Sequence, residues 1–117
     1  MLIKKLRNFG FNTNNRTYII AEIGINHRGS VKVAKQLIDS AVRSGVDAVK
    51  FQTYITEQRA PKGNDEVFKI LKDLELPFEA FKELQDYARR HDVDFFSTPF
   101  DKESVEYLES IGTDLYK

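Results

Sequence analysis

Three apolar runs in this 117-residue sequence each end on polar side chains that could do chemistry. The runs and the polar residues that follow them occupy residues 18–29, 48–53 and 95–101. The first group offers an acid, an amide and an imidazole, the second a lysine and a glutamine, and the third a serine and a threonine. Such groups at the carboxyl ends of buried strands are typical of the active-site rim of an α/β barrel. The pattern therefore favours an anion-binding or acid–base site.

Lys50 is the most informative of these residues, because it is flanked by Val49 and Phe51. A lysine on a buried strand must either be paired or serve a ligand. One interpretation is a salt bridge to a neighbouring strand, for example to Glu22. The other is an anion site, which Lys117 at the end of another apolar segment favours, because two lysines at strand ends suit a phosphate or carboxylate.

Glu22 and Thr98 have similarly open roles. Glu22 follows an apolar strand and could act as a general acid or base, as a partner of Lys50, or as both. The Thr98 hydroxyl could donate to a phosphate oxygen, or Thr98 could simply form a fixed corner with Pro99. Because residues i and i+2 of a strand share a face, we expect one convergent set at the mouth of the sheet: Glu22, Lys50, Gln52, Thr98 and Lys117.

Other polar residues are assigned structural roles first. Asn64 is expected to be a helix N-cap. A lone loop histidine such as His27 is more often a hydrogen-bonding surface residue than a metal ligand or catalyst. His91 suits a helix end, where a cation is favoured. The two histidines do not have the spacing of a metal motif, so this segment predicts no metal site of its own.

Alternating elements must position these residues. Strands are predicted at 18–23, 47–52, 93–97 and 114–117. Helices are predicted from Ser30 to Gly45, over 65–74, from Pro77 to near His91, and from Asp101 to Gly112. Residues 54–64 are expected to be a polar connection, and residues 1–17 a short hairpin or extended lead-in.

This β-α-β-α-β-α-β order indicates an α/β fold with a parallel sheet and right-handed crossovers. Four strands could form a small open sheet or the N-terminal half of a TIM (β/α)8 barrel. The end of the sequence inside a strand favours the half-barrel, so residues 1–117 are interpreted as the N-terminal portion of one barrel domain, truncated at the fourth strand.

Composition sets the broad class. Eighteen basic and eighteen acidic residues give a net charge of zero, which indicates no general affinity for nucleic acid or an anionic membrane. The sequence contains no cysteine, which excludes disulfides and thiolate chemistry. It shows neither a signal peptide nor an apolar run of spanning length. We expect a soluble cytoplasmic protein.

Four blocks together resemble the sialic acid synthase family, which makes N-acetylneuraminate and related nonulosonic acids. The blocks are residues 21–29 (AEIGINHRG), 41–54 (AVRSGVDAVKFQTY), 96–101 (FSTPFD) and 115–117 (LYK). The resemblance implies a TIM barrel followed by a small antifreeze-like domain, in a homodimer. It also implies carbohydrate biosynthesis by a transferase that condenses phosphoenolpyruvate with an N-acylated aminosugar, such as N-acetylmannosamine or its 6-phosphate. A divalent metal, Mn²⁺ or Mg²⁺, would polarise the sugar aldehyde.

The resemblance also suggests roles for individual residues. Lys50, Thr98 and Lys117 look like phosphoenolpyruvate-binding groups, and Glu22 like the acidic residue beside the reacting centre. Gln52 looks like a sugar contact, and Asn64 matches a sugar-contacting asparagine across an alignment gap. The metal ligands of the family are expected outside this segment.

Because the sequence ends at the fourth strand, the resemblance implies that most of the sugar site is missing. We therefore expect these 117 residues alone to be inactive. The alternatives are another phosphoenolpyruvate-condensing barrel, of the 3-deoxy-heptulosonate phosphate synthase type, and a non-catalytic half-barrel that self-associates through its open sheet edges. The residues do not decide between free sugar and 6-phosphate, or between neuraminate, legionaminate, pseudaminate and spore-coat products.

Overall fold

A computed structural model describes residues 17–117 of the chain. The predicted lead-in at residues 1–17 lies outside the described residues except for its last position. The elements in chain order are β1 (Ile20–Gly24), α2 (Val31–Arg43), β2 (Ala48–Thr53), α3 (Thr56–Arg59), α4 (Asp65–Leu74), α5 (Phe78–Arg90), β3 (Asp94–Pro99) and α6 (Lys102–Ser110).

The three strands form a parallel sheet in the order β1-β2-β3. Glu22 on β1 is in register with Lys50 on β2, and Gln52 on β2 is in register with Thr98 on β3. The β1–β2 register shifts between Glu22 and Gly24, which is a bulge. Parallel pairing brings the carboxyl ends of all three strands to one edge of the sheet, as the sequence predicts.

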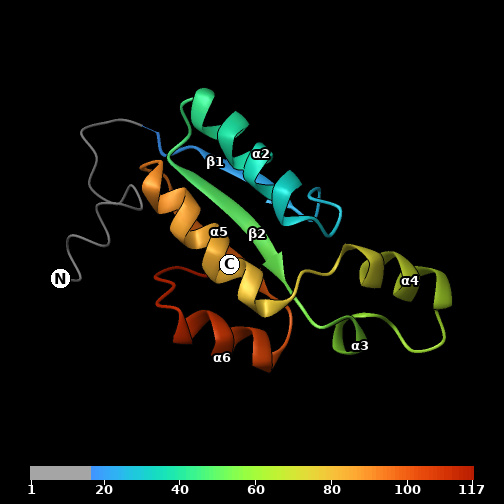
Figure 1. Cartoon of the computed structure of the whole chain (residues 1–117). Helices are drawn as coiled ribbons and strands as arrows, with labels where there is room; N and C mark the ends of the chain where they lie inside the picture. The colour runs from blue at the N-terminus through green and yellow to red at the C-terminus, as the bar shows by residue number, and fades with distance from the viewer. Residues whose placement is uncertain (1–16) are drawn as a thin grey trace.

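One face of the sheet forms the hydrophobic core with α2 and α5 (Figure 1). Val49, Phe51 and Phe95 are almost wholly buried in this core, and the Phe51 and Phe95 rings lie 5.5 Å apart between centroids. The two helices pack on each other as well, since the Tyr87 hydroxyl donates to Asp39 at 2.7 Å. Because side chains alternate along a strand, Lys50 and Gln52 must point to the other face.

Helix starts are fixed by side chains that the sequence marks as caps. Ser30, Asn64 and Asp101 each accept a hydrogen bond from the backbone N–H three residues ahead, at the beginning of α2, α4 and α6 respectively. Pro77 occupies the N-cap position of α5 without a side-chain bond. Capping satisfies amides that the first helical turn leaves without partners.

The structure corrects two local expectations. Residues 54–64 contain the short helix α3 rather than only a polar connection. The predicted fourth strand at 114–117 is reduced to a single parallel bridge between Ser97 and Tyr116, extended by a bond of 3.3 Å from the Lys117 N–H to the Ser97 carbonyl. A four-residue segment was too short to show which of its residues would pair.

No helix within residues 17–117 is long and apolar enough to cross a membrane.

Candidate active site

Lys50 is the centre of a polar cluster on the sheet face opposite the core. It is 8% exposed. Its Nζ lies 2.5 Å from Oε2 of Glu22 on β1 and donates to Oγ1 of Thr98 on β3 at 3.1 Å. Three neighbouring strands therefore each contribute one polar group to a single contact. A buried ammonium is stabilised in this way, because its charge is paired and two of its three protons have acceptors.

The two partners of Lys50 differ in their access to solvent. The Glu22 side chain is 48% exposed, whereas that of Lys50 is only 11% exposed. The carboxylate can therefore reach an incoming molecule directly, while the lysine lies at the bottom of the cluster. In this arrangement the buried cation can attract an anion, and the accessible carboxylate can exchange a proton.

Gln52 extends the cluster toward the carboxyl end of β2. Its Oε1 is buried and has no hydrogen-bond partner among the described residues. A buried acceptor without a partner is costly, and such an atom at a candidate site indicates a place for a donor from a ligand. Gln52 is therefore placed where a substrate hydroxyl or amide could bind.

Gly24 allows Glu22 and Gln52 to approach the β1 backbone. Its φ of +58° lies in the left-handed region. A Cβ at this position would lie 3.0 Å from Oε1 of Glu22 and 3.4 Å from Nε2 of Gln52. The glycine at the bulge thus leaves room for two site side chains. This role of Gly24 was not predicted from the sequence. The glycine-punctuated motif was a signal, but it did not show which glycine met which side chain.

His27 does not join this cluster. It is 1% exposed, and its ring stacks on Phe51, which faces the core, with 6.2 Å between ring centroids. Its Nδ1 accepts a bond of 3.0 Å from the Gly29 N–H, so the proton of the neutral ring resides on Nε2. Burial lowers the pKa of His27 to about 4. His27 is therefore a neutral core residue at physiological pH. The expected hydrogen bond is present, but the expected surface position is wrong, because the ring packs on Phe51 and is buried.

Asn64 and Lys117 lie at the margins. The Asn64 side chain is exposed and its Oδ1 caps α4 through Val67, so the expected capping role is confirmed. Lys117 is exposed, and because Tyr116 is paired with Ser97, Lys117 comes next to Thr98 in register. None of the ion pairs formed within residues 17–117 includes Lys117. The substrate contacts predicted for Asn64 and Lys117 stay predictions.

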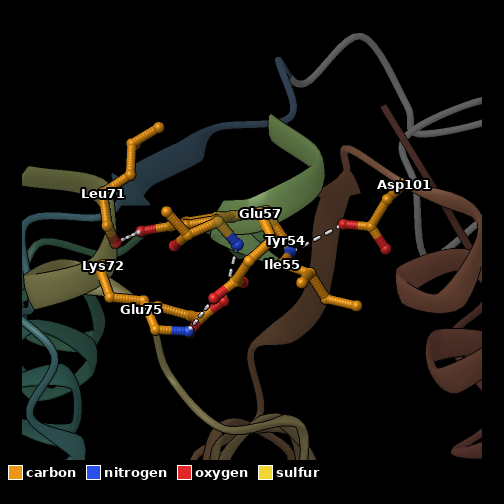
Figure 2. Close-up of polar contacts among 8 residues, drawn as sticks. Tyr54, Ile55, Glu57, Leu71, Lys72, Glu75 and Asp101 are labelled. Atoms are coloured by element: carbon orange, nitrogen blue, oxygen red, sulfur yellow. Dashed lines mark hydrogen bonds and ion pairs between the residues drawn. The ribbon is translucent and has the colours of Figure 1, made fainter. Parts of the chain in front are cut away.

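A hydrogen-bond network fastens the segment between β2 and α5 beside the site (Figure 2). The Tyr54 hydroxyl donates to the Leu71 carbonyl at 2.7 Å. Asp101 accepts the Ile55 N–H at 2.8 Å and the Ser104 N–H at 2.7 Å. Asp101 thereby joins the loop after β2 to the start of α6. Sequence reasoning found the capping bond of Asp101 but missed its long-range bond, for which there was no local signal.

The region around α3 and α4 also contains an exposed charge network. Lys72 lies 2.9 Å from carboxylate oxygens of both Glu57 and Glu75, and Glu75 also accepts the Thr56 N–H at 2.8 Å. These bonds hold α3 against α4, as Figure 2 shows. The segment that carries Asn64 is therefore fixed at its two ends.

The described residues do not supply a metal site. No group of three or more histidine, cysteine, aspartate or glutamate side chains within residues 17–117 is arranged to hold a metal ion. Glu22 is paired with Lys50, and a cation in place of the ammonium would find too few oxygen ligands here. The divalent metal that the resemblance implies does not fit these residues.

Comparison with known proteins decides the family. The NeuB family profile matches residues 37–117. The chain belongs to the NeuB family. The chain is 40% identical to N,N'-diacetyllegionaminic acid synthase of Campylobacter jejuni over 115 residues, which cover 87% of this chain and 34% of that enzyme. It is 41% identical to an uncharacterized protein of Methanocaldococcus jannaschii over 101 residues, which cover 86% of this chain and 30% of that protein.

A solved structure supports the same assignment. N-acetylneuraminic acid synthetase of Leptospira borgpetersenii, crystallised with citrate, matches with a TM-score of 0.81 and 30% identity, over 90% of this chain and 39% of that one. The resemblance to sialic acid synthases and the α/β fold class of this NeuB family chain are thus confirmed. The chain spans about a third of the length of these relatives.

Proposed function

We propose that this chain forms one wall of the active site of a nonulosonic acid synthase that condenses phosphoenolpyruvate with an N-acylated aminosugar. One observation carries the proposal: a buried lysine at the centre of the sheet contacts an accessible carboxylate and a hydroxyl from the two neighbouring strands. A buried cation with a nearby hydroxyl suits an anionic substrate. The names of the relatives supply the class of product.

In the proposed reaction, carbon 3 of phosphoenolpyruvate attacks the aldehyde carbon of the open-chain sugar. Water then adds to carbon 2, and phosphate leaves by cleavage of its C–O bond. Lys50 and Thr98 would bind and orient the anionic end of phosphoenolpyruvate. Glu22 would exchange a proton with the reacting groups, because its carboxylate is accessible and held next to Lys50.

The acceptor would lie toward the carboxyl ends of the strands. Gln52 would donate to or accept from the sugar through its amide, since its Oε1 lacks a partner among the described residues. Lys117 would add a second cation beside Thr98. The divalent metal, the remaining sugar contacts and the homodimer of the family would depend on residues beyond the described ones.

A chimera tests this proposal. The chain replaces the aligned segment of the C. jejuni synthase, and product formation from phosphoenolpyruvate and acylaminosugar is measured with Mn²⁺ present. We expect the chimera to make product and the 117-residue chain alone to make none. Lys50→Met in the chimera should lower kcat/KM by about a hundredfold or more, as for other electrostatic groups in active sites.

The matched control is Lys82→Met, because Lys82 is half-exposed on α5 and, within residues 17–117, its side chain pairs only with Asp86 of the same helix. It should leave kcat/KM within about twofold. A folded chimera without activity, or a Lys50→Met chimera as active as the control, would contradict the proposed role of this wall.

A further inference from the structure

The guanidinium of Arg59 stacks against two aromatic rings at the carboxyl ends of the strands. Its Cζ lies 3.8 Å from the ring centroid of Phe100 and 4.6 Å from that of Tyr54. The two rings meet edge to face, with 6.4 Å between centroids. Contact with two perpendicular rings restricts the orientation of the guanidinium, so its N–H donors are held in advance for a planar or tetrahedral oxyanion.

The positive charge of Arg59 has no carboxylate partner in the described part of the chain. Its Nη1 is buried without a hydrogen bond, and no ion pair within residues 17–117 includes it. The acidic side chains of the neighbouring segments have other partners. Glu57 and Glu75 pair with Lys72, and Asp101 accepts hydrogen bonds from backbone N–H groups. Burial lowers the pKa of Arg59, yet a guanidinium stays protonated in proteins.

Arg59 lies at the carboxyl ends of β2 and β3, because the two rings that it contacts follow these strands. Tyr54 directly follows β2 and Phe100 directly follows β3, and the Phe100 N–H donates to the Thr53 carbonyl at 3.0 Å. Tyr54 therefore comes two residues after Gln52, and Phe100 two residues after Thr98. Two residues correspond to about 7 Å along a strand. Arg59 is thus a second cation, next to rings that follow the strands at whose centre Lys50 lies.

We propose that Arg59 binds a phosphate group carried by the acceptor sugar, and so makes this chain selective for a phosphorylated over an unphosphorylated acceptor. This inference rests on the proposed function, in which Lys50 and Thr98 bind the other anionic substrate. A second cation further from the sheet centre, without a protein counter-charge in the described residues, matches a second anion on the second substrate. A fixed guanidinium fork suits phosphate because it can bind two oxygens at once.

Equilibrium binding to the chimera described above tests the proposal, because the chain alone is expected to lack most of the sugar site. Dissociation constants are measured by calorimetry for N-acetylmannosamine 6-phosphate, N-acetylmannosamine and phosphoenolpyruvate. Arg59→Gln should weaken binding of the 6-phosphate about tenfold or more, the loss expected for one charge-assisted contact. Binding of the unphosphorylated sugar and of phosphoenolpyruvate should not change. Arg59→Lys, which keeps the charge but not the fork, should show a smaller loss for the 6-phosphate.

The matched control is Arg43→Gln, because Arg43 ends α2 and its side chain bonds only Ser40 of the same helix among the described residues. It should alter none of the three constants. The proposal is overturned if the chimera with Arg59 unchanged does not bind the 6-phosphate, if Arg59→Gln weakens both sugars equally, or if it weakens phosphoenolpyruvate instead.

Lys50→Met separates this inference from the proposed function. If Lys50→Met leaves phosphoenolpyruvate binding intact while Arg59→Gln still acts only on the 6-phosphate, the proposed role of Lys50 is wrong and the Arg59 assignment stands. If Lys50→Met abolishes phosphoenolpyruvate binding and Arg59→Gln acts on no ligand, the Arg59 assignment is wrong and the role of Lys50 stands.

Discussion

Glu22 and Lys50 are register partners on adjacent parallel strands, and Oε2 of Glu22 lies 2.5 Å from Nζ of Lys50. The carboxylate is half-exposed while the ammonium is buried. Removal of the carboxylate therefore leaves a buried charge with a single described partner, the Thr98 hydroxyl. The pair links the stability of the sheet to the proposed chemistry of the site.

Glu22→Gln is expected to destabilise the chain. The loss of charge leaves Lys50 poorly compensated, and we expect the free energy of unfolding to fall by about 1–3 kcal/mol. Urea unfolding followed by circular dichroism measures the change. Glu57→Gln is the control, because Glu57 belongs to an exposed pair with Lys72 and should cost less than about 1 kcal/mol. Equal effects of the two substitutions would show that the Glu22–Lys50 pair behaves as a surface pair.

Gly24→Ala is expected to disturb both Glu22 and Gln52. The new methyl group would lie 3.0 Å from the Glu22 carboxylate oxygen, and φ is +58°. The left-handed backbone alone should cost about 1–2 kcal/mol. Gly45→Ala is a matched control, because Gly45 also has a positive φ but a Cβ there would meet nothing within 4 Å.

The difference between the two alanine variants therefore isolates the steric contact with the site. We expect Gly24→Ala to be the more destabilising variant in urea unfolding and to shift the side-chain amide resonances of Gln52 in NMR spectra. Identical unfolding curves for the two variants would mean that the Glu22 side chain moves away at no cost.

Acid should destabilise the chain through His27. Its pKa is about 4 in the folded chain because of burial, and about 6.5 when unfolded. The unfolded chain thus binds the proton more readily, so stability is complete above about pH 6.5 and falls as the pH drops toward 4. The expected loss over this range is about 2 kcal/mol.

Urea unfolding at pH 7 and pH 4.5 measures this loss. The comparison with His27→Gln isolates the histidine, because carboxylates titrate in both proteins. His91→Gln serves as the matched substitution at an exposed histidine. A pH dependence that His27→Gln does not reduce would show that His27 is not buried in solution.

Self-association of the chain is expected when it is produced alone. Within residues 17–117, β1 pairs only with β2, and Ile19 and Ile20 beside this edge are 48% and 44% exposed. Unpaired edges with apolar side chains favour strand addition from another molecule. Light scattering should show a mass that rises with protein concentration above 13.6 kDa. Ile20→Lys should reduce this rise in mass, and a monomeric mass at all concentrations would refute the predicted self-association.

The sequence by itself determined the order of elements and the identity of the cluster. Apolar runs, Ser30, Asn64, Asp101 and their spacing are local signals, and strand alternation then assigns Lys50 to the face opposite Phe51. For this reason Glu22, Lys50, Gln52 and Thr98 could be predicted to converge. The helix α3 was missed because its four residues are too few to show a periodic pattern.

Only the tertiary structure decided which groups actually meet. Register and the bulge at Gly24 set the distances from Lys50 to its partners, and packing placed His27 in the core rather than in the site. The stacking of Arg59 on Phe100 and the bond from Ile55 to Asp101 join residues more than forty positions apart. Such contacts depend on how separate elements pack, which no local pattern of residues encodes.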